Sequence, residues 1–116
     1  MLSKEEKSII KQWLCQFQLS NPIRKVSRDL SDGVLVAELL HQLFPRMVDL
    51  HNYTKGFAVA RKLDNWETLN RKVLMKLGIF LTPDIIHSVA SGNQDTVFDV
   101  LLEIMIKAEQ HDIQCL

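Results

Sequence analysis

The chain has 116 residues, of which 47% are hydrophobic, and it carries 14 basic and 14 acidic side chains. This length is enough for one hydrophobic core but too short for two ordinary domains, so a single domain is expected over residues 1–116, with its core within residues 3–109. The sequence contains no apolar run long enough to span a membrane and no apolar leader of the signal-peptide type, so a soluble, cytoplasmic protein without a membrane partner is expected.

The first predicted helix covers residues 3–18. Its apolar residues recur every three or four positions and include Ile9 and Trp13, of which Trp13 is expected to anchor the core. Ser3 and Glu6 have the spacing of a capping box, which satisfies two backbone N–H groups at the start of a helix. This segment is therefore expected to be amphipathic, with its apolar face on the core.

The second predicted helix, residues 31–43, is apolar on nearly every face. Asp32 precedes Val34 and is expected to cap the first turn, while Leu35 and Leu39 are expected in the core. A helix that is apolar all round must lie inside a bundle rather than on its surface. This helix is therefore predicted to be buried.

The longest predicted helix covers residues 58–77 and follows an irregular connection at residues 45–57. In that connection, Tyr53 is expected to close the loop against the core. Gly78 is well placed to end the helix, because glycine adopts the left-handed backbone conformation common after a helix C-terminus. The apolar stripe of this helix supplies the remaining expected core residues, which are Leu63, Trp66, Leu69 and Val73.

Two further helices complete the predicted fold. Thr82 and Pro83 are typical of a helix start and predict a short helix through residue 90. Asn93 is expected to cap the last helix, which should end near Glu109. No strand is predicted, so the expected architecture is an all-α compact bundle of about four main helices with short connecting helices.

Few residues in this chain favour catalysis or ligand binding. The four histidines are widely spaced, the four glycines form no phosphate-binding loop, and Cys15 and Cys115 indicate neither a metal site nor a disulfide framework. Asp29 and Asp32 are interpreted as caps of helix starts, and His41 as a hydrogen-bonded packing residue. We therefore expect no enzyme activity, no metal and no cofactor, and the neutral net charge argues against nucleic acid as a partner.

Three strings of residues occur in a fixed order in this sequence. They are Ser-Arg-Asp-Leu-Ser-Asp-Gly at residues 27–33, His-Asn-Tyr at residues 51–53 and Lys-Leu-Asp-Asn-Trp-Glu-Thr-Leu-Asn-Arg-Lys-Val-Leu at residues 62–74. With these strings the chain resembles, over about residues 13–102, the calponin-homology domain of the sperm flagellar protein 1 group. The resemblance implies a calponin-homology fold in a cytoskeletal protein of the ciliary or flagellar axoneme. Dimerisation is expected only through segments outside this chain.

The charges are unevenly distributed along the chain. Residues 22–76 carry ten basic and six acidic side chains, whereas residues 77–116 carry one lysine and six acidic side chains. A basic middle segment would attract the acidic outer surface of a cytoskeletal polymer. The resemblance makes tubulin in microtubules the expected partner. The order of elements also resembles that of the microtubule end-binding proteins, which carry a single domain of this fold. Residues 92–95 lack the lysine that those proteins tend to carry there. Binding along the microtubule lattice is therefore expected, rather than tracking of the growing tip.

The candidate tubulin contacts are basic residues in or near the matching strings. Arg28 is the first candidate, because it precedes the buried helix and can project from a surface loop. Its alternative role is to hold that loop by pairing with Asp29, Asp32 or a backbone carbonyl group. The other candidates are Arg24, Lys25, Arg71, Lys72 and Lys76. The last two are four residues apart and would share one face of the longest helix.

Two other functions stay open from the sequence. The domain could be a protein-interaction scaffold with weak affinity for tubulin, which an exposed apolar patch in place of a basic one would favour. Actin binding is the more distant alternative, since actin-binding domains of this kind usually occur as two consecutive copies and this chain has room for one.

Overall fold

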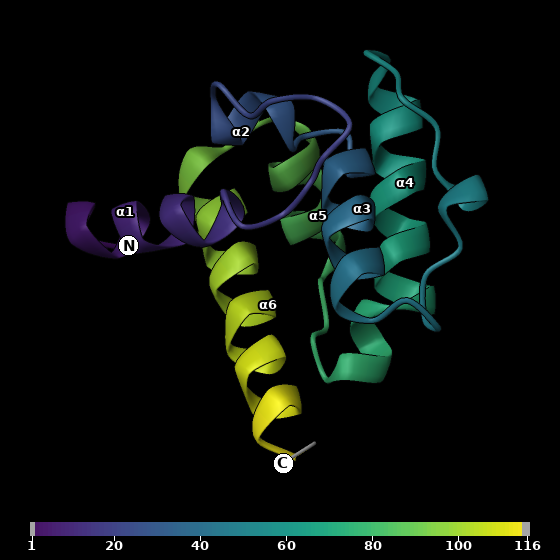
Figure 1. Cartoon of the computed structure of the whole chain (residues 1–116). Coiled ribbons are helices and arrows are strands. Elements are labelled where there is room, and N and C mark those ends of the chain that lie inside the picture. The colour runs from purple at the N-terminus through teal and green to yellow at the C-terminus, as the bar shows by residue number, and fades with distance from the viewer. Residues whose placement is uncertain (1, 115–116) are drawn as a thin grey trace.

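The computed structural model of this chain describes residues 2–114, the last three by their backbone alone, and this range is all helical (Figure 1). The α-helices are α1 (Lys4–Leu14), α2 (Val26–Asp29), α3 (Val34–Leu43), α4 (Val59–Lys72), α5 (Pro83–Ala90) and α6 (Gln94–Gln114). Two 3-10 helices, η1 (Leu50–Asn52) and η2 (Leu74–Leu77), lie in the connections. The described range contains no strand, which confirms the all-α prediction.

Helix α3 is buried, as its composition predicted. Six of its ten residues are inaccessible to solvent, including Leu35 and Leu39. Its start lies against α4 because Gly33, with a φ of 80°, has no side chain: a Cβ at this position would lie 3.3 Å from Leu69 Cδ1 and 3.5 Å from Trp66 Nε1. Figure 1 shows α3 and α4 running beside each other on one side of the molecule.

The other helices complete the bundle around this pair. Helix α4 packs against α5, α5 packs against α6, and both α1 and α2 lie against α6. Figure 1 shows α5 between α6 and the α3–α4 side of the molecule. The surface between α2 and the start of α4 is therefore formed by segments that are far apart in sequence.

The expected core residues lie in or against one buried cluster. The fully buried ones are Leu35, Leu39, Trp66, Leu69 and Val73. Trp13 and Leu63 are half-buried and pack against this cluster, and the ring of Trp13 meets Phe17 edge-on with centroids 5.1 Å apart. Tyr53 is buried, as expected for a residue that closes its loop against the core.

The predicted helix caps are present. They are the reciprocal pair Ser3 and Glu6, Asp32 at the start of α3, Thr82 at the start of α5 and Asn93 at the start of α6. Each accepts a hydrogen bond from a backbone N–H group that has no partner within its own helix. Local sequence therefore determines where these four helices begin.

Helix α1 ends at Leu14, and the predicted end at residue 18 is wrong. Gln42 of α3 donates its side-chain amide to the Gln18 carbonyl group (2.7 Å) and accepts from the Gln18 N–H (3.2 Å). Glu38, also in α3, accepts from the backbone N–H and the hydroxyl group of Ser20 at 2.7 and 2.6 Å. These side chains form hydrogen bonds with backbone groups of Gln18 and Ser20 that a longer helix would otherwise have paired, so the helix can end at Leu14.

Helix α4 ends at Lys72, so the predicted single helix over residues 58–77 is also wrong. Val73 and Leu74 are both fully buried. Val73 has a φ of −124° and a ψ of −62°, which lie outside the α-helical region, so the helix ends there. The chain instead forms η2 and ends it at Gly78, which has a φ of 83°. Lys72 and Lys76 therefore do not share a face of one helix.

Two further boundaries differ from the prediction. The sequence predicted no helix over α2, and α6 continues to Gln114 instead of ending near Glu109. Cys15 is exposed and its thiol is not in a disulfide, whereas Cys115 lies outside the described residues. The short α2 has consequences for the candidate binding residues, because Arg28 lies within it.

Candidate functional site

A single carboxylate organises the segment that carries the first three candidate residues. Asp29 Oδ2 accepts hydrogen bonds from the backbone N–H groups of Arg24 (2.8 Å) and Lys25 (2.9 Å). The Lys25 N–H, followed by the Arg24 N–H and the Arg28 guanidinium group, lowers the pKa of Asp29, against the opposing effect of burial. Asp29 is thus structural, as predicted, but it fixes the turn that leads into α2 and does not cap the start of α3.

Arg28 lies in α2, so the expectation that it projects from a loop is wrong. Its Nε is 3.2 Å from Asp29 Oδ1, and 67% of its side chain is exposed. The ion pair uses only Nε, and within residues 2–111 the two terminal nitrogens of the guanidinium group have no polar partner. Arg28 therefore pairs with Asp29, as its alternative role required, and still presents two nitrogens to solvent.

Two of the matching strings meet at the start of α4. The indole N–H of Trp66 donates to the Ser31 carbonyl group (2.8 Å), and the Asn65 side chain donates to the Asp32 carbonyl group (2.8 Å). Asn65 also donates to the Thr54 carbonyl group (2.8 Å) and accepts from its N–H (3.3 Å). Asn65 is fully buried, so these bonds join three segments of chain in a setting without water.

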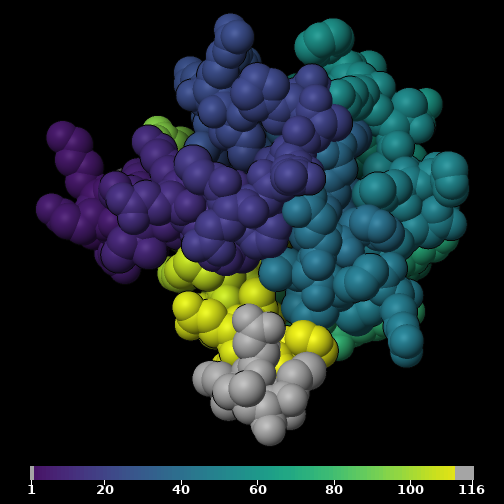
Figure 2. Space-filling model, viewed as in Figure 1, coloured from purple at the N-terminus to yellow at the C-terminus, as the bar shows by residue number. Residues whose placement is uncertain are grey.

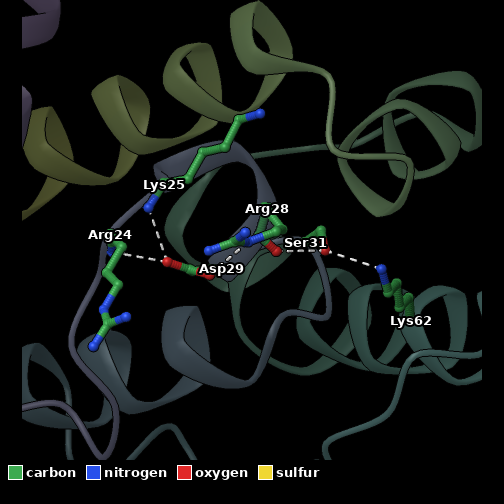
Figure 3. A network of polar contacts seen from close by, with 6 residues as sticks. All are labelled: Arg24, Lys25, Arg28, Asp29, Ser31 and Lys62. Carbon is green, nitrogen blue, oxygen red and sulfur yellow. Dashed lines mark hydrogen bonds and ion pairs between the residues drawn. The ribbon is translucent and has the colours of Figure 1, made fainter.

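Lys62 extends this network to the surface. Its Nζ donates to Ser31 Oγ (3.1 Å), and Ser31 Oγ in turn donates to the Arg28 carbonyl group (2.8 Å). Figure 3 shows the resulting chain of contacts from Lys62 through Ser31 to Arg28, with Arg24 and Lys25 beyond Asp29. A cation of α4 is thereby held close to the cations of α2 and the turn before it.

These residues enclose a groove of about 730 Å³, which we call the basic groove. Its cationic lining residues are Arg24, Arg28, Lys55 and Lys62. The Lys55 ammonium group also meets the side-chain amide of Asn21 across the groove. The lining carboxylates are Asp29 and Asp32, and both accept hydrogen bonds from backbone N–H groups. The groove therefore has an excess of positive charge over negative charge on its walls.

The remaining candidates form a separate group, which we call the distal cluster: Arg71, Lys72 and Lys76. Arg71 and Lys72 lie in the last turn of α4, and Lys76 lies in η2. Lys62 is in the first turn of α4, so ten residues, or roughly 15 Å of helix, separate it from Lys72. The structure thus places Arg24 and Arg28 in the basic groove, Lys25 on a second groove, and the distal cluster at the other end of α4.

Sequence reasoning missed three residues of the groove. Lys55 and Lys62 were counted only as part of the basic middle segment, and Phe57 was placed in an irregular connection without a role. A signal existed for Lys62, because it stands three and four residues before Asn65 and Trp66 and so lies on the same side of the helix. The positions of Lys55 and Phe57 depend on the bonds between Thr54 and Asn65, which are not visible in sequence.

The described part of the chain contains neither a group of metal-binding side chains nor a membrane-spanning helix. Within it, no group of three or more His, Cys, Asp or Glu side chains is placed to hold a metal ion. None of the helices between residues 2 and 114 has the length and apolarity needed to cross a bilayer. His41 Nδ1 is 3.2 Å from the Val48 carbonyl oxygen, in the packing role predicted for it.

Comparison with known proteins gives a consistent set of relatives. The family described as "CH-like domain in sperm protein" matches residues 10–106. Sperm flagellar protein 1 of Mus musculus is 43% identical over 98 residues, and the proteins of the same name from Bos taurus and Homo sapiens are 42% and 41% identical over the same length. Each match covers 84% of this chain and 42% of the relative, so the chain spans about two fifths of the length of these proteins.

Proposed function

The chain belongs to the family of CH-like domains of sperm proteins, and on that premise we propose that it is a non-catalytic microtubule-binding module of a ciliary or flagellar axoneme. The basic groove carries this proposal. It lies where two of the strings shared with the sperm flagellar protein 1 group meet, and it presents four cations on a concave surface. The relatives are named for the flagellum, an organelle built on microtubules. The acidic tubulin lattice is the partner that this charge fits.

In this proposal the cations of the groove act in two ways. Their summed field speeds the encounter with an acidic surface, and Arg28 then pairs with a carboxylate through its two solvent-facing nitrogens. Asp29 holds Nε, so the guanidinium group is already oriented when the partner arrives. Less conformational entropy is lost on binding as a result.

The test is co-sedimentation of the domain with stabilised microtubules and, in parallel, with actin filaments, at low and moderate salt. We expect wild type to pellet with microtubules in a salt-sensitive manner, and Arg28→Ala to bind about tenfold more weakly. The matched control is Lys72→Ala in the distal cluster, which should bind within about twofold of wild type. Thermal melts of each variant establish that it is folded.

The outcomes separate the candidate functions. If wild type stays in the supernatant with microtubules at low salt, lattice binding is wrong. If Lys72→Ala loses affinity and Arg28→Ala does not, the binding surface is the distal cluster. Pelleting with actin filaments alone would replace tubulin with actin as the partner.

A scaffold role has one observation in its favour. A second groove, of about 720 Å³, lies between the end of α1 and the start of α6. Its lining includes the apolar residues Leu14, Phe17, Leu19, Ile23 and Phe98 together with the cations Lys11, Arg24 and Lys25. A groove with an apolar part of this kind suits a peptide or helix from another protein. This role becomes the leading candidate if wild type has no affinity for bare microtubules.

A further inference from the structure

Phe57 is the most exposed large apolar residue in the described part of the chain. Its exposure is 99%, and Val59, two residues later, is 64% exposed. Both follow the loop that forms one wall of the basic groove, and Phe57 is itself among the residues that line the groove. A fully exposed phenylalanine forgoes the free energy that burial of its ring would provide, so a partner that covered the ring would gain this free energy.

The loop holds Phe57 outward through specific contacts. Thr54 is fixed to the buried Asn65 by two hydrogen bonds, at 2.8 and 3.3 Å. Gly56 packs so closely on α4 that a Cβ at this position would lie 2.8 Å from Arg61 Cγ. The chain is therefore held beside α4 on both sides of Lys55, and Phe57 directly follows the second of these contacts.

The surroundings of Phe57 indicate what that partner is. The cations of the basic groove lie beside it, and the two carboxylates of the groove are occupied by backbone N–H groups. An aromatic ring next to a group of cations is the composition of a binding hot spot for an acidic protein surface. A concave basic site beside a protruding ring fits a partner with an acidic ridge and an apolar depression next to it, which a flat lipid surface lacks.

We propose that Phe57 is the apolar anchor of microtubule binding: its ring enters an apolar depression of the tubulin lattice, while the cations of the basic groove pair with the carboxylates around that depression. This inference rests on the proposed function and adds a residue, a type of contact and a geometry to it. It divides the binding surface into an apolar part and an ionic part that respond differently to salt.

The division gives the experiment its readout. The affinity of wild type and variants for stabilised microtubules is measured by co-sedimentation over a series of salt concentrations. Phe57→Ala is expected to bind about tenfold more weakly than wild type at every salt concentration, so the two salt dependences run parallel, because the ring makes no ionic contact. Arg24→Gln, which removes a cation of the groove, is expected to make the salt dependence shallower.

Phe80→Ala is the matched control, since Phe80 is 66% exposed and lies after η2, away from the groove. It is expected to bind microtubules as wild type does. If Phe57→Ala binds as tightly as wild type while Arg28→Ala is weakened, the anchor is wrong and the proposed function stands. If wild type does not bind, both fail.

Vesicles containing phosphatidylserine form a second arm of the experiment. A ring flanked by cations could insert into an anionic membrane, and wild type should not co-sediment with these vesicles if the partner is tubulin. Vesicle binding that Phe57→Ala abolishes, with microtubule binding unchanged, would assign Phe57 to a lipid surface and overturn the inference.

Discussion

The two ends of α4 carry similar numbers of cations in different settings. At its start, Lys62 is tied to Ser31, and the buried side chains of Asn65 and Trp66 bind the backbone of the α2–α3 turn. At its end, Lys72 and Lys76 are exposed, and within residues 2–111 their side chains form no hydrogen bond or ion pair. Positive charge there complements the negative end of the helix dipole, which is a common structural role for such residues.

The difference shows that charge alone does not identify a binding surface. Both groups are basic and both include residues of the matching strings. The sequence ranked Arg28 first only on the expectation that it projects from a loop, and that expectation is wrong. The start of α4 adds a groove, a buried hydrogen-bond network beneath it and an exposed aromatic ring beside it. Rigid support of this kind is what positions charged groups for a partner.

Replacing one asparagine in each half of α4 is the strongest test of that contrast. Asn65→Ala removes three part-buried hydrogen bonds to the backbone of Thr54 and Asp32 and leaves a cavity at a fully buried site, so we expect a loss of about 3 kcal/mol in unfolding free energy. Asn70→Ala removes two bonds to Leu81 at a half-buried site, for which about 1 kcal/mol is expected.

Urea denaturation of both variants measures this difference, and the melting temperature of Asn65→Ala should fall by roughly 15 °C. If the two variants lose equal amounts of unfolding free energy, the start of α4 is no more strongly stabilised by side-chain hydrogen bonds than its end. The contrast between the two regions would then reduce to the groove and its aromatic residue.

Two glycines give a second comparison with smaller expected effects. Gly33 and Gly78 have φ values of 80° and 83°, so an alanine at either position is strained. At Gly33 the added Cβ would also lie 3.3 Å from Leu69 Cδ1 and 3.4 Å from Asn65 Cβ, whereas at Gly78 the nearest atom is Lys107 Nζ at 3.6 Å. We expect Gly33→Ala to cost about 2 kcal/mol and Gly78→Ala about 1 kcal/mol, as measured by thermal unfolding.

If the Gly78 variant is the less stable of the two, close packing at the start of α3 does not support the groove as described. The φ values are nearly the same, so a difference in either direction reports packing rather than backbone strain.

The smallest expected effect concerns Asp29 and pH. The pKa of Asp29 is lower in the folded protein than its ordinary value of 3.8, chiefly through the Lys25 N–H. A carboxylate with a lowered pKa stabilises the fold at every pH above its ordinary value, and this contribution is lost as the pH falls through the lowered value. Asp29→Asn should therefore be less stable than wild type at neutral pH, and the two unfolding free energies should converge in acid.

The control is Asp99→Asn in α6, at an exposed residue without a hydrogen bond or ion pair in the described range. It should be about as stable as wild type at neutral pH, because no hydrogen bond or ion pair is lost. If the unfolding free energies of Asp29→Asn and wild type still differ at a pH below the lowered pKa, Asp29 acts through its shape and not through its charge.

The parts of the fold that sequence predicted are those set by neighbouring residues. The burial of α3 follows from an apolar surface on every side, and the starts of α1, α3, α5 and α6 follow from their capping residues. The ends of α1 and α4 were wrong because they depend on distant side chains. The side chain of Gln42 forms hydrogen bonds with the backbone of Gln18, and Val73, buried in the core, leaves the helical conformation after α4.

The candidate site divides in the same way. Arg24 and Arg28 are close in sequence, and so their grouping in the basic groove could be predicted. The second wall of the groove could not, because Lys55, Phe57 and Lys62 reach it only through bonds that join residues 11 to 33 positions apart. Asn65 makes most of these bonds, and a single buried amide gives no signal of that role in sequence.

The two tryptophans of this protein lie in unlike surroundings, and this has an optical consequence. Trp66 is only 1% exposed and its indole N–H is bonded to the Ser31 carbonyl group on the wall of the basic groove, whereas Trp13 is half-buried against Phe17. Fluorescence from Trp66 is therefore emitted at shorter wavelength and is shielded from soluble quenchers, while Trp13 is accessible to them. Because Trp66 does not itself line the groove, we expect a partner seated there to alter the shielded component only through the Ser31 contact, which makes this emission an internal reporter of occupancy.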